Sequence, residues 1–502
     1  MGEKLEQLKQ HLYRKYDLDH AAAVLSWDQE VNMPPGGVNA RAEQMATLQS
    51  ISHEIFTSDE TGALLEAAEE ETAELDYDSD EASLVRVTRR TFDRMTKIPT
   101  ELVAEMARVT AQAFVAWRKA READKYPIFQ PHLDKVVDLN RRVADILGYE
   151  EHPYDALLDF YEPDITTAQV AALFNDLKAG LVPLLQEIVE EGEPVDDGFF
   201  SSQSYPIDRQ WDLTVSVLRQ IGYDFQHGRQ DKAPHPFTIH FSTNDVRVTT
   251  RLYEHRPQSA VFSSVHEGGH ALYEQGIPEH FERTELEGGA TLGLHESQSR
   301  MWENMMGRSR TFWQYYLPIM RAFFPEQLAG ISLDRFYRAI NKVEPDLIRV
   351  EADEVTYNMH IFVRFELEQA LVTGDLPVAD VPGAWNDKYE EYLGIRPPSD
   401  ADGCLQDIHW SHGTIGYFPT YALGNLIAAQ LYRRVQKEIP DLEAGYAEGK
   451  FQPLLDWMRE HVHAHGSKFT APELVERVLG EEIQAQPLLD YMRAKYTEVY
   501  NL

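Results

Sequence analysis

The chain has 502 residues with a single cysteine, and 83 acidic against 47 basic side chains give a formal net charge of −36 at pH 7. Such an acidic surface repels polyanions, which excludes nucleic acid and anionic membranes as expected partners. The lone Cys404 excludes an internal disulfide and suits a reducing compartment. The sequence has no secretory signal and no apolar run near the roughly 18 residues that span a bilayer. We therefore expect a soluble, cytoplasmic protein.

Helical periodicity accounts for most of the chain, and the apolar fraction of 43% favours a packed globule. Helices are predicted, in chain order, at residues 4–18, 40–55, 84–121 with a break near Pro99, 131–147, 167–191 and 207–221. The acidic run at 66–83 is interpreted as a solvated face or connection without a chemical role. Because no long linker or internal repeat divides the sequence, we predict a mainly α fold with a single domain over residues 1–502.

Two short segments break the helical pattern. Residues 235–241 and 246–252 alternate with period two and are rich in β-branched side chains, with turn-forming residues at 242–245. They predict a small β-hairpin, which could either pair with an extended peptide or serve only as scaffold. A helix is predicted to follow, beginning at Ser263 or Ser264, either of which can cap its first turn.

This helix carries the pattern HEGGH at residues 266–270. The two histidines stand one turn apart on one face and can bind the same metal ion, while Glu267 projects beside that ion, where it can act as general base. The pattern predicts a zinc hydrolase. Gly268 and Gly269 disfavour a helix, so they indicate that a substrate backbone or a crossing helix packs closely against this turn.

The metal ligands His266 and His270 require a third partner. A third histidine of the metzincin type is excluded because Tyr273 and Gly276 replace the glycine and histidine of that pattern. The remaining common solution is a carboxylate from a following helix, and Glu296 lies 26 residues after His270. Taken alone, Glu296 would be interpreted as a surface glutamate of a helix rather than as a ligand.

Several separated motifs together resemble the carboxypeptidase Taq family of zinc metallocarboxypeptidases. They occur in the order of that family: HPF at 235–237, DVRVT at 245–249, HEGGH at 266–270, HESQ at 295–298, IRVEAD at 348–353 and GCLQDIHW at 403–410. The similarity extends over nearly the whole chain. Six motifs in one order are far more specific than a lone metal signature.

The resemblance implies a gluzincin-type, mainly helical fold like that of neurolysin and angiotensin-converting enzyme, with a deep central groove and a small β-hairpin beside the metal-binding helix. It implies a single peptidase domain over residues 1–502, assembled as a homodimer. The implied activity is the release of single amino acids from the C-termini of peptide substrates, with broad specificity. The implied cofactor is Zn²⁺, with Co²⁺ as a substitute in some members.

Recognition of a terminal carboxylate suits arginine, whose planar guanidinium can donate two parallel hydrogen bonds. Arg247, on the predicted second strand, and Arg349, on a predicted helix that also holds Asp353, match the two motif arginines of the family. Without the resemblance, a salt bridge with a nearby acid would be the favoured interpretation of each arginine. Asp353 or its neighbour Glu354 is a candidate to accept the second ring N–H of a metal-binding histidine.

Aromatic residues and histidines cluster between 406 and 425. By analogy with the fold relatives, we expect His409 and either Tyr417 or Tyr421 to stabilise the oxyanion of the transition state. Packing is the alternative role for each tyrosine.

Two other functions stay open at this point. One is a zinc oligopeptidase or aminopeptidase with the same ligands, and the other is a non-enzymatic acidic helical scaffold with an incidental metal pattern. The products formed from an N-blocked peptide distinguish a carboxypeptidase from an oligopeptidase or aminopeptidase. Metal analysis of the purified protein, together with the effect of a chelator on peptide cleavage, distinguishes an enzyme from a scaffold.

Overall fold

The computed structural model describes residues 2–502, which form two compact units. Each unit is assembled from segments that are distant in sequence. Unit 1 contains residues 1–96, 196–340 and 431–481, and unit 2 contains residues 97–195, 341–430 and 482–502. The prediction of one peptidase domain over 1–502 stays a prediction.

Unit 1 holds the small sheet and most of the helices. Its helices are α1 (Glu3–Val31), α2 (Val38–Phe56), α3 (Asp59–Thr72), α4 (Asp80–Lys97), α9 (Gly198–Ser201), α10 (Ile207–Ile221), α11 (Pro257–Glu274), α12 (Leu292–Arg300), α13 (Arg310–Phe323), α14 (Leu333–Ile340), α18 (Leu442–Ala447), α19 (Gln452–His461) and α20 (Ala471–Leu479). A π-helical turn, η4 (Met301–Met306), continues α12. Helix α17 (Pro419–Glu438) begins in unit 2 and ends in unit 1.

The sheet of unit 1 has three strands in the order β1-β3-β2. They are β1 (Gly228–Lys232), β2 (Thr238–Ser242) and β3 (Asp245–Thr250). The central strand β3 pairs antiparallel with β2, as in the predicted hairpin, and parallel with β1. An irregularity between His240 and Ser242 interrupts the register of β2. Val246 and Val248 of β3 are buried, which anchors the sheet in the apolar core of the unit.

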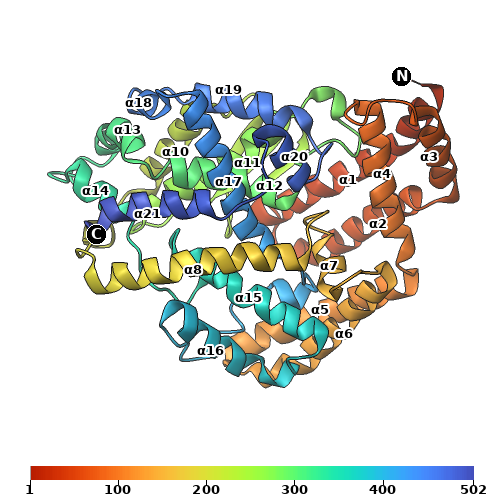
Figure 1. Ribbon diagram of the computed structural model, residues 1–502, viewed down its shortest axis with the longest axis horizontal. Coiled ribbons are helices and arrows are strands. Elements are labelled where there is room, and N and C mark those ends of the chain that lie inside the picture. Colours follow the sequence, from red (N-terminus) through yellow and green to blue (C-terminus); the bar gives the residue numbers. More distant parts are fainter. Residues whose placement is uncertain (1) are drawn as a thin grey trace. The chain divides into compact units, whose positions relative to one another are not determined.

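Helix α11 lies beside α10 and α12 in the core of unit 1 (Figure 1). Its two glycines explain how closely these helices approach. A Cβ added at Gly269 would lie 2.7 Å from the Ser299 Cα of α12, and one added at Gly268 would lie 2.6 Å from Leu218 Cδ2 of α10. A crossing helix is therefore the reason that glycine is needed at position 269.

Unit 2 is helical. Its helices are α5 (Thr100–Ala123), α6 (Gln130–Leu147), α7 (Pro153–Leu158), α8 (Thr167–Glu191), α15 (Thr356–Thr373), α16 (Val381–Leu393), α21 (Gln486–Tyr500) and the first part of α17. Two short 3₁₀ turns, η5 (Arg349–Glu351) and η7 (His409–His412), carry residues from the family motifs. Among residues 2–502, no helix is both long enough and apolar enough to cross a membrane.

The mainly α fold class with a small sheet is confirmed. The sequence predictions missed strand β1. The acidic run at 66–83 comprises the end of α3, the connection at 73–79 and the start of α4, and residues 73–78 are exposed, as the prediction of a solvated face or connection requires. Helix α11 begins at Pro257 rather than at Ser263 or Ser264. Proline suits this first helical position because its missing N–H would be unpaired there anyway.

Candidate active site

Three side chains of unit 1 converge as the sequence predicts. His266 and His270 come from α11 and Glu296 from α12, and one ligand atom from each lies within 4.8 Å of the others. Glu296 Oε2 is 3.7 Å from His266 Nε2 and 3.5 Å from His270 Nε2. The other oxygen, Oε1, accepts a hydrogen bond of 2.6 Å from Arg300 Nε. Glu296 therefore presents one oxygen to the same point as the two imidazoles.

The second nitrogen of each histidine ring is also held. His266 Nδ1 lies 2.9 Å from Glu303 Oε2, and His270 Nδ1 lies 2.6 Å from His295 Nδ1. His295 Nε2 in turn lies 2.5 Å from the buried Glu274 Oε1. Such contacts fix the orientation of an imidazole that binds a metal through its other nitrogen.

Burial and charge set the protonation of this cluster. Burial lowers the pKa of His270 to about 4, which keeps its ring neutral and able to bind a metal. Burial by itself would raise the pKa of Glu296 and Glu303. For Glu296 the positive charge of Arg300 outweighs burial, and for Glu303 the hydrogen bond with His266 does. Both carboxyls therefore have a pKa well below the usual range. These two carboxylates are therefore anionic at neutral pH.

Glu267 lies on the same helix, beside the converging ligands. It is buried, and its Oε2 accepts a 2.8 Å hydrogen bond from the hydroxyl of Thr238 on β2. Burial raises the pKa of the Glu267 carboxyl, which increases its basicity. The side chain is thus held in one orientation by the sheet and is suited to exchange a proton.

The donor set fits a transition-metal ion of the zinc class. Two imidazole nitrogens and one carboxylate oxygen converge, and tetrahedral ligands about 2.0–2.2 Å from zinc lie roughly 3.5 Å apart, close to the separations from Glu296 Oε2. Three protein ligands leave a fourth position for water or substrate. The arrangement is that of a catalytic rather than a structural site.

Arg247 lies on β3 in unit 1. Its Nε and Nη2 each donate a 2.8 Å hydrogen bond to the carboxylate of Asp245, and its guanidinium stacks 4.3 Å from the ring centre of Trp27. Arg247 therefore forms the salt bridge with a nearby acid that was the alternative to substrate binding. The guanidinium is only partly buried, with 18% of the side chain exposed.

Arg349 lies in unit 2, on η5 rather than on the predicted helix, because α15 starts only at Thr356. Its Nε and Nη2 donate to Asp407 Oδ1 at 3.0 and 2.9 Å, and its Nη1 donates to the Tyr357 hydroxyl at 2.9 Å. Asp407 Oδ2 accepts from a second arginine, Arg364. Two arginines thus share one carboxylate, which leaves a net positive charge.

Unit 2 also brings His409, Tyr417 and Tyr421 together. The His409 ring centre is 5.4 Å from that of Tyr417, the two tyrosine rings are 5.3 Å apart, and the Arg349 guanidinium is 5.1 Å from the Tyr421 ring. Burial lowers the pKa of His409 to about 4, so its ring is neutral at neutral pH. Its Nδ1 has no hydrogen-bond partner among the described residues, although Asp407 Oδ1 is 3.9 Å away.

Asp353 lies in unit 2 at the start of α15. Its carboxylate accepts hydrogen bonds from the backbone N–H groups of Glu344, Val355 and Thr356 and from the Thr356 hydroxyl. These contacts account for Asp353 as an acceptor for the backbone that leads into α15. A role for it beside a metal histidine stays a prediction.

Comparison with known proteins decides the family. The model of the carboxypeptidase Taq (M32) metallopeptidase family matches residues 7–496. The chain belongs to this family. Thermostable carboxypeptidase 1 of Thermus thermophilus is 43% identical, with 95% of each chain covered, and carboxypeptidase 1 of Bacillus subtilis is 38% identical, with 98% of this chain and 99% of the relative covered.

Solved structures of the family agree with this assignment. An M32 carboxypeptidase from Deinococcus radiodurans is 41% identical and superposes with a TM-score of 0.96 over the full length of both chains. The carboxypeptidase of Pyrococcus furiosus is 39% identical, with a TM-score of 0.96 over 99% of each chain. The chain is therefore a metallocarboxypeptidase with a His/His/Glu metal-binding group.

The sequence predictions missed the partners that orient the family's metal ligands. Glu303 lies seven residues after Glu296, and His295 lies directly before Glu296. Glu274 lies four residues after His270. Helical spacing could have indicated Glu303 and Glu274, since residues four or seven apart share a face. Thr238 carries no such signal because it belongs to a strand.

Proposed function

We propose that the enzyme uses zinc to remove single amino acids from peptide C-termini, with Glu267 as general base. The observation that carries the proposal is the convergence of His266, His270 and Glu296 beside a buried glutamate, in a chain that belongs to a metallocarboxypeptidase family. Zinc in such a site lowers the pKa of a bound water and polarises the scissile carbonyl.

Glu267 accepts the proton of the attacking water and later donates it to the leaving amine. Its raised pKa and the hydrogen bond from Thr238 support this role, because the carboxylate is basic and cannot rotate away freely. Cobalt is expected to replace zinc, since the same two imidazoles and carboxylate suit both ions.

Arg349 and Arg247 are proposed to bind the terminal carboxylate of the substrate. The stronger argument concerns Arg349, because Arg349 and Arg364 share only Asp407 and so retain a positive charge that an anion can neutralise. Arg247 forms a one-to-one pair with Asp245 and carries no such surplus. Binding of the terminal carboxylate would place only the last peptide bond at the metal, which makes the enzyme an exopeptidase.

His409 and one of Tyr417 and Tyr421 are proposed to donate to the oxyanion of the transition state. A neutral imidazole carries one N–H that can donate, and low pKa keeps His409 in this form. Substitution of His409 by alanine should lower kcat more than it raises KM, because the contact forms mainly in the transition state.

The decisive experiment is mass spectrometry of one N-blocked peptide digested by the zinc-loaded protein. We expect stepwise loss of C-terminal residues from this peptide. The same peptide with a C-terminal amide should not be cleaved. Internal fragments would identify an oligopeptidase instead, and cleavage unaffected by a chelator would refute the metal mechanism.

A pair of arginine variants tests how the C-terminus is recognised. Arg349→Gln should lower kcat/KM for the free acid by about 30-fold or more, because it removes one partner of a buried charge contact. Arg247→Gln is the matched variant on unit 1 and is expected to have the smaller effect. Equal rates on acid and amide peptides in the wild type would refute carboxylate recognition.

The enzyme is also proposed to act as a homodimer, in keeping with the family resemblance. Light scattering coupled to size-exclusion chromatography should give twice the chain mass of 57.6 kDa. A monomer mass at micromolar concentration would contradict this proposal.

A further inference from the structure

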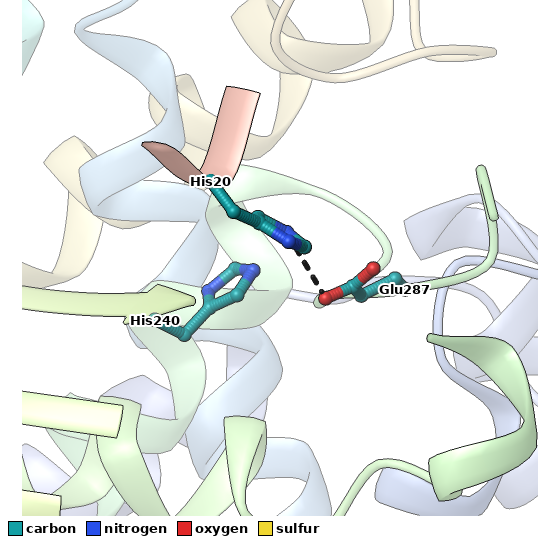
Figure 2. Close-up of side chains that lie close together, drawn as sticks. All are labelled: His20, His240 and Glu287. Atoms are coloured by element: carbon teal, nitrogen blue, oxygen red, sulfur yellow. Dashed lines mark ion pairs between the residues drawn. The ribbon is translucent and has the colours of Figure 1, made fainter. Parts of the chain in front are cut away.

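A second group of two histidines and one glutamate lies in unit 1, apart from the catalytic ligands. His20 comes from α1, His240 from β2, and Glu287 from the loop that precedes α12. One ligand atom from each lies within 4.8 Å of the others. Figure 2 shows the three side chains pointing toward a common point.

Glu287 has the least exposed side chain of this group. Only 6% of its side chain is exposed, and its Oε2 accepts a 2.7 Å hydrogen bond from the backbone N–H of Arg283. Its other oxygen, Oε1, is buried and has no hydrogen-bond partner of good geometry among the described residues, although His20 Nε2 is 3.2 Å away. A buried carboxylate oxygen that faces two imidazoles is stabilised by a cation, which is either protonated His20 or a metal ion shared by the three side chains.

His240 is oriented in the manner of a metal ligand. Its Nδ1 lies 3.4 Å from Oε2 of the buried Glu274, whose other oxygen contacts His295. A ring nitrogen held by a carboxylate leaves the opposite nitrogen available and makes it more basic.

The position of His20 is fixed by the docking of α1 on the loop that holds Glu287. Arg283 Nη2 donates to Asp17 Oδ2 at 2.5 Å, and Glu285 Oε1 accepts from Lys15 Nζ at 3.0 Å. These contacts precede His20 on the helix by three and five residues. The cations next to the group are thus paired with acids other than Glu287.

We propose that His20, His240 and Glu287 bind a second divalent transition-metal ion of the zinc class. Two imidazoles and one carboxylate oxygen are a donor set for zinc or cobalt rather than for calcium or magnesium, which prefer oxygen ligands. The His20 and His240 side chains are 24% and 32% exposed, so an ion can enter and a water can complete its coordination.

The second site is connected to the catalytic site by a chain of side-chain contacts. His240 contacts Glu274, Glu274 contacts His295, and His295 contacts the catalytic ligand His270. An ion bound to His240 lies at the far end of this chain of contacts from His270, and no ligand belongs to both sites. It also joins α1 to β2 and to the loop before α12, so zinc is expected to stabilise this part of unit 1.

The experiment counts zinc in the full-length protein by inductively coupled plasma mass spectrometry, after removal of metal and dialysis against buffered zinc. Wild type is expected to retain two ions per chain, and His20→Gln and Glu287→Gln one each. His270→Gln, which lacks a catalytic ligand, should also retain one, and the double variant His20→Gln/His270→Gln close to none. Circular dichroism establishes that each variant is folded.

His280→Gln is the matched control, since His280 is an exposed histidine of unit 1 paired with Asp80 outside the group. It should retain two ions. In the His270→Gln background, zinc should still raise the melting temperature, and the added His20→Gln change should abolish that rise.

One ion per chain in wild type, or the same count in wild type, His20→Gln and Glu287→Gln, would overturn the proposal. The group would then be an ion pair between protonated His20 and Glu287. Loss of zinc from His270→Gln concerns only the catalytic site, so the two hypotheses fail independently.

Discussion

The two His/His/Glu groups of unit 1 contain the same chemistry but are built differently. The catalytic ligands His266, His270 and Glu296 come from two packed helices within 31 consecutive residues, whereas His20, His240 and Glu287 come from a helix, a strand and a loop. The catalytic imidazoles are the less exposed, with 19% and 17% of their side chains accessible. Rigid helices favour a fixed catalytic geometry, while a group that joins separate elements is suited to hold them together.

Strand β2 takes part in both groups. Thr238 donates to Glu267 of the catalytic site, and His240, two residues later on the same strand, contacts Glu274. Glu267 and Glu274 are seven residues apart on α11 and so share one helix face. Two side chains on the same face of β2, Thr238 and His240, thus contact two glutamates that lie two turns apart on α11. One of these contacts lies beside each His/His/Glu group.

The largest expected effect is a loss of activity without a loss of metal, on replacement of the glutamate beside the catalytic group. Glu267→Gln should lower kcat by roughly 10³-fold, because the general base is lost, while the zinc count stays that of wild type. Peptide hydrolysis and metal analysis on the same preparation measure both. Substantial turnover in this variant would rule out Glu267 as the base.

Removal of an orienting carboxylate should affect only the catalytic group. Glu303→Gln is expected to weaken zinc binding at His266 by about 10–100-fold, since the Nδ1 partner loses its charge. Competition with a chromogenic chelator measures the affinity. The melting-temperature rise caused by zinc at the second site should persist, and its loss would show that the groups are one cooperative unit.

The next prediction tests the close packing of α11 against α12, the two helices that hold the catalytic ligands. Gly269→Ala places a methyl group against the Ser299 backbone and should lower the free energy of unfolding by about 1–3 kcal/mol. Denaturant melts measure this change. Gly383→Ala on α16 is the control, because a Cβ there meets nothing within 4 Å and should cost no stability. Equal stability of both variants would mean that α12 does not need glycine at 269.

The smallest expected effect concerns the loop of the second group. Gly288, beside Glu287, has φ +92°, so Gly288→Ala should cost about 1–2 kcal/mol of backbone strain. That strain should weaken the second zinc several-fold and leave the catalytic zinc unchanged, as measured by calorimetric titration. A matching loss at the catalytic site would contradict the independence of the two ligand sets.

The residues of the His/His/Glu metal-binding group could be predicted from the sequence. His266 and His270 are one helical turn apart, so local periodicity was enough to predict these two together. Glu296 followed instead from the exclusion of the metzincin pattern and from the family motif HESQ at 295–298. The boundaries of α10 and the break between α4 and α5 followed from the same periodicity and from Pro99. The six motifs indicated the family over the whole chain.

Contacts between strands, loops and segments far apart in the chain could not be predicted from the sequence and became visible in the fold. Strand β1 was missed because GRQDK lacks the apolar alternation of a strand, and it forms only by pairing with β3. His20 and Glu287 are separated by 267 residues, and no spacing rule relates them. The docking of α1 on the loop before α12 brings them together, because long-range packing is set by complementary side chains rather than by local periodicity.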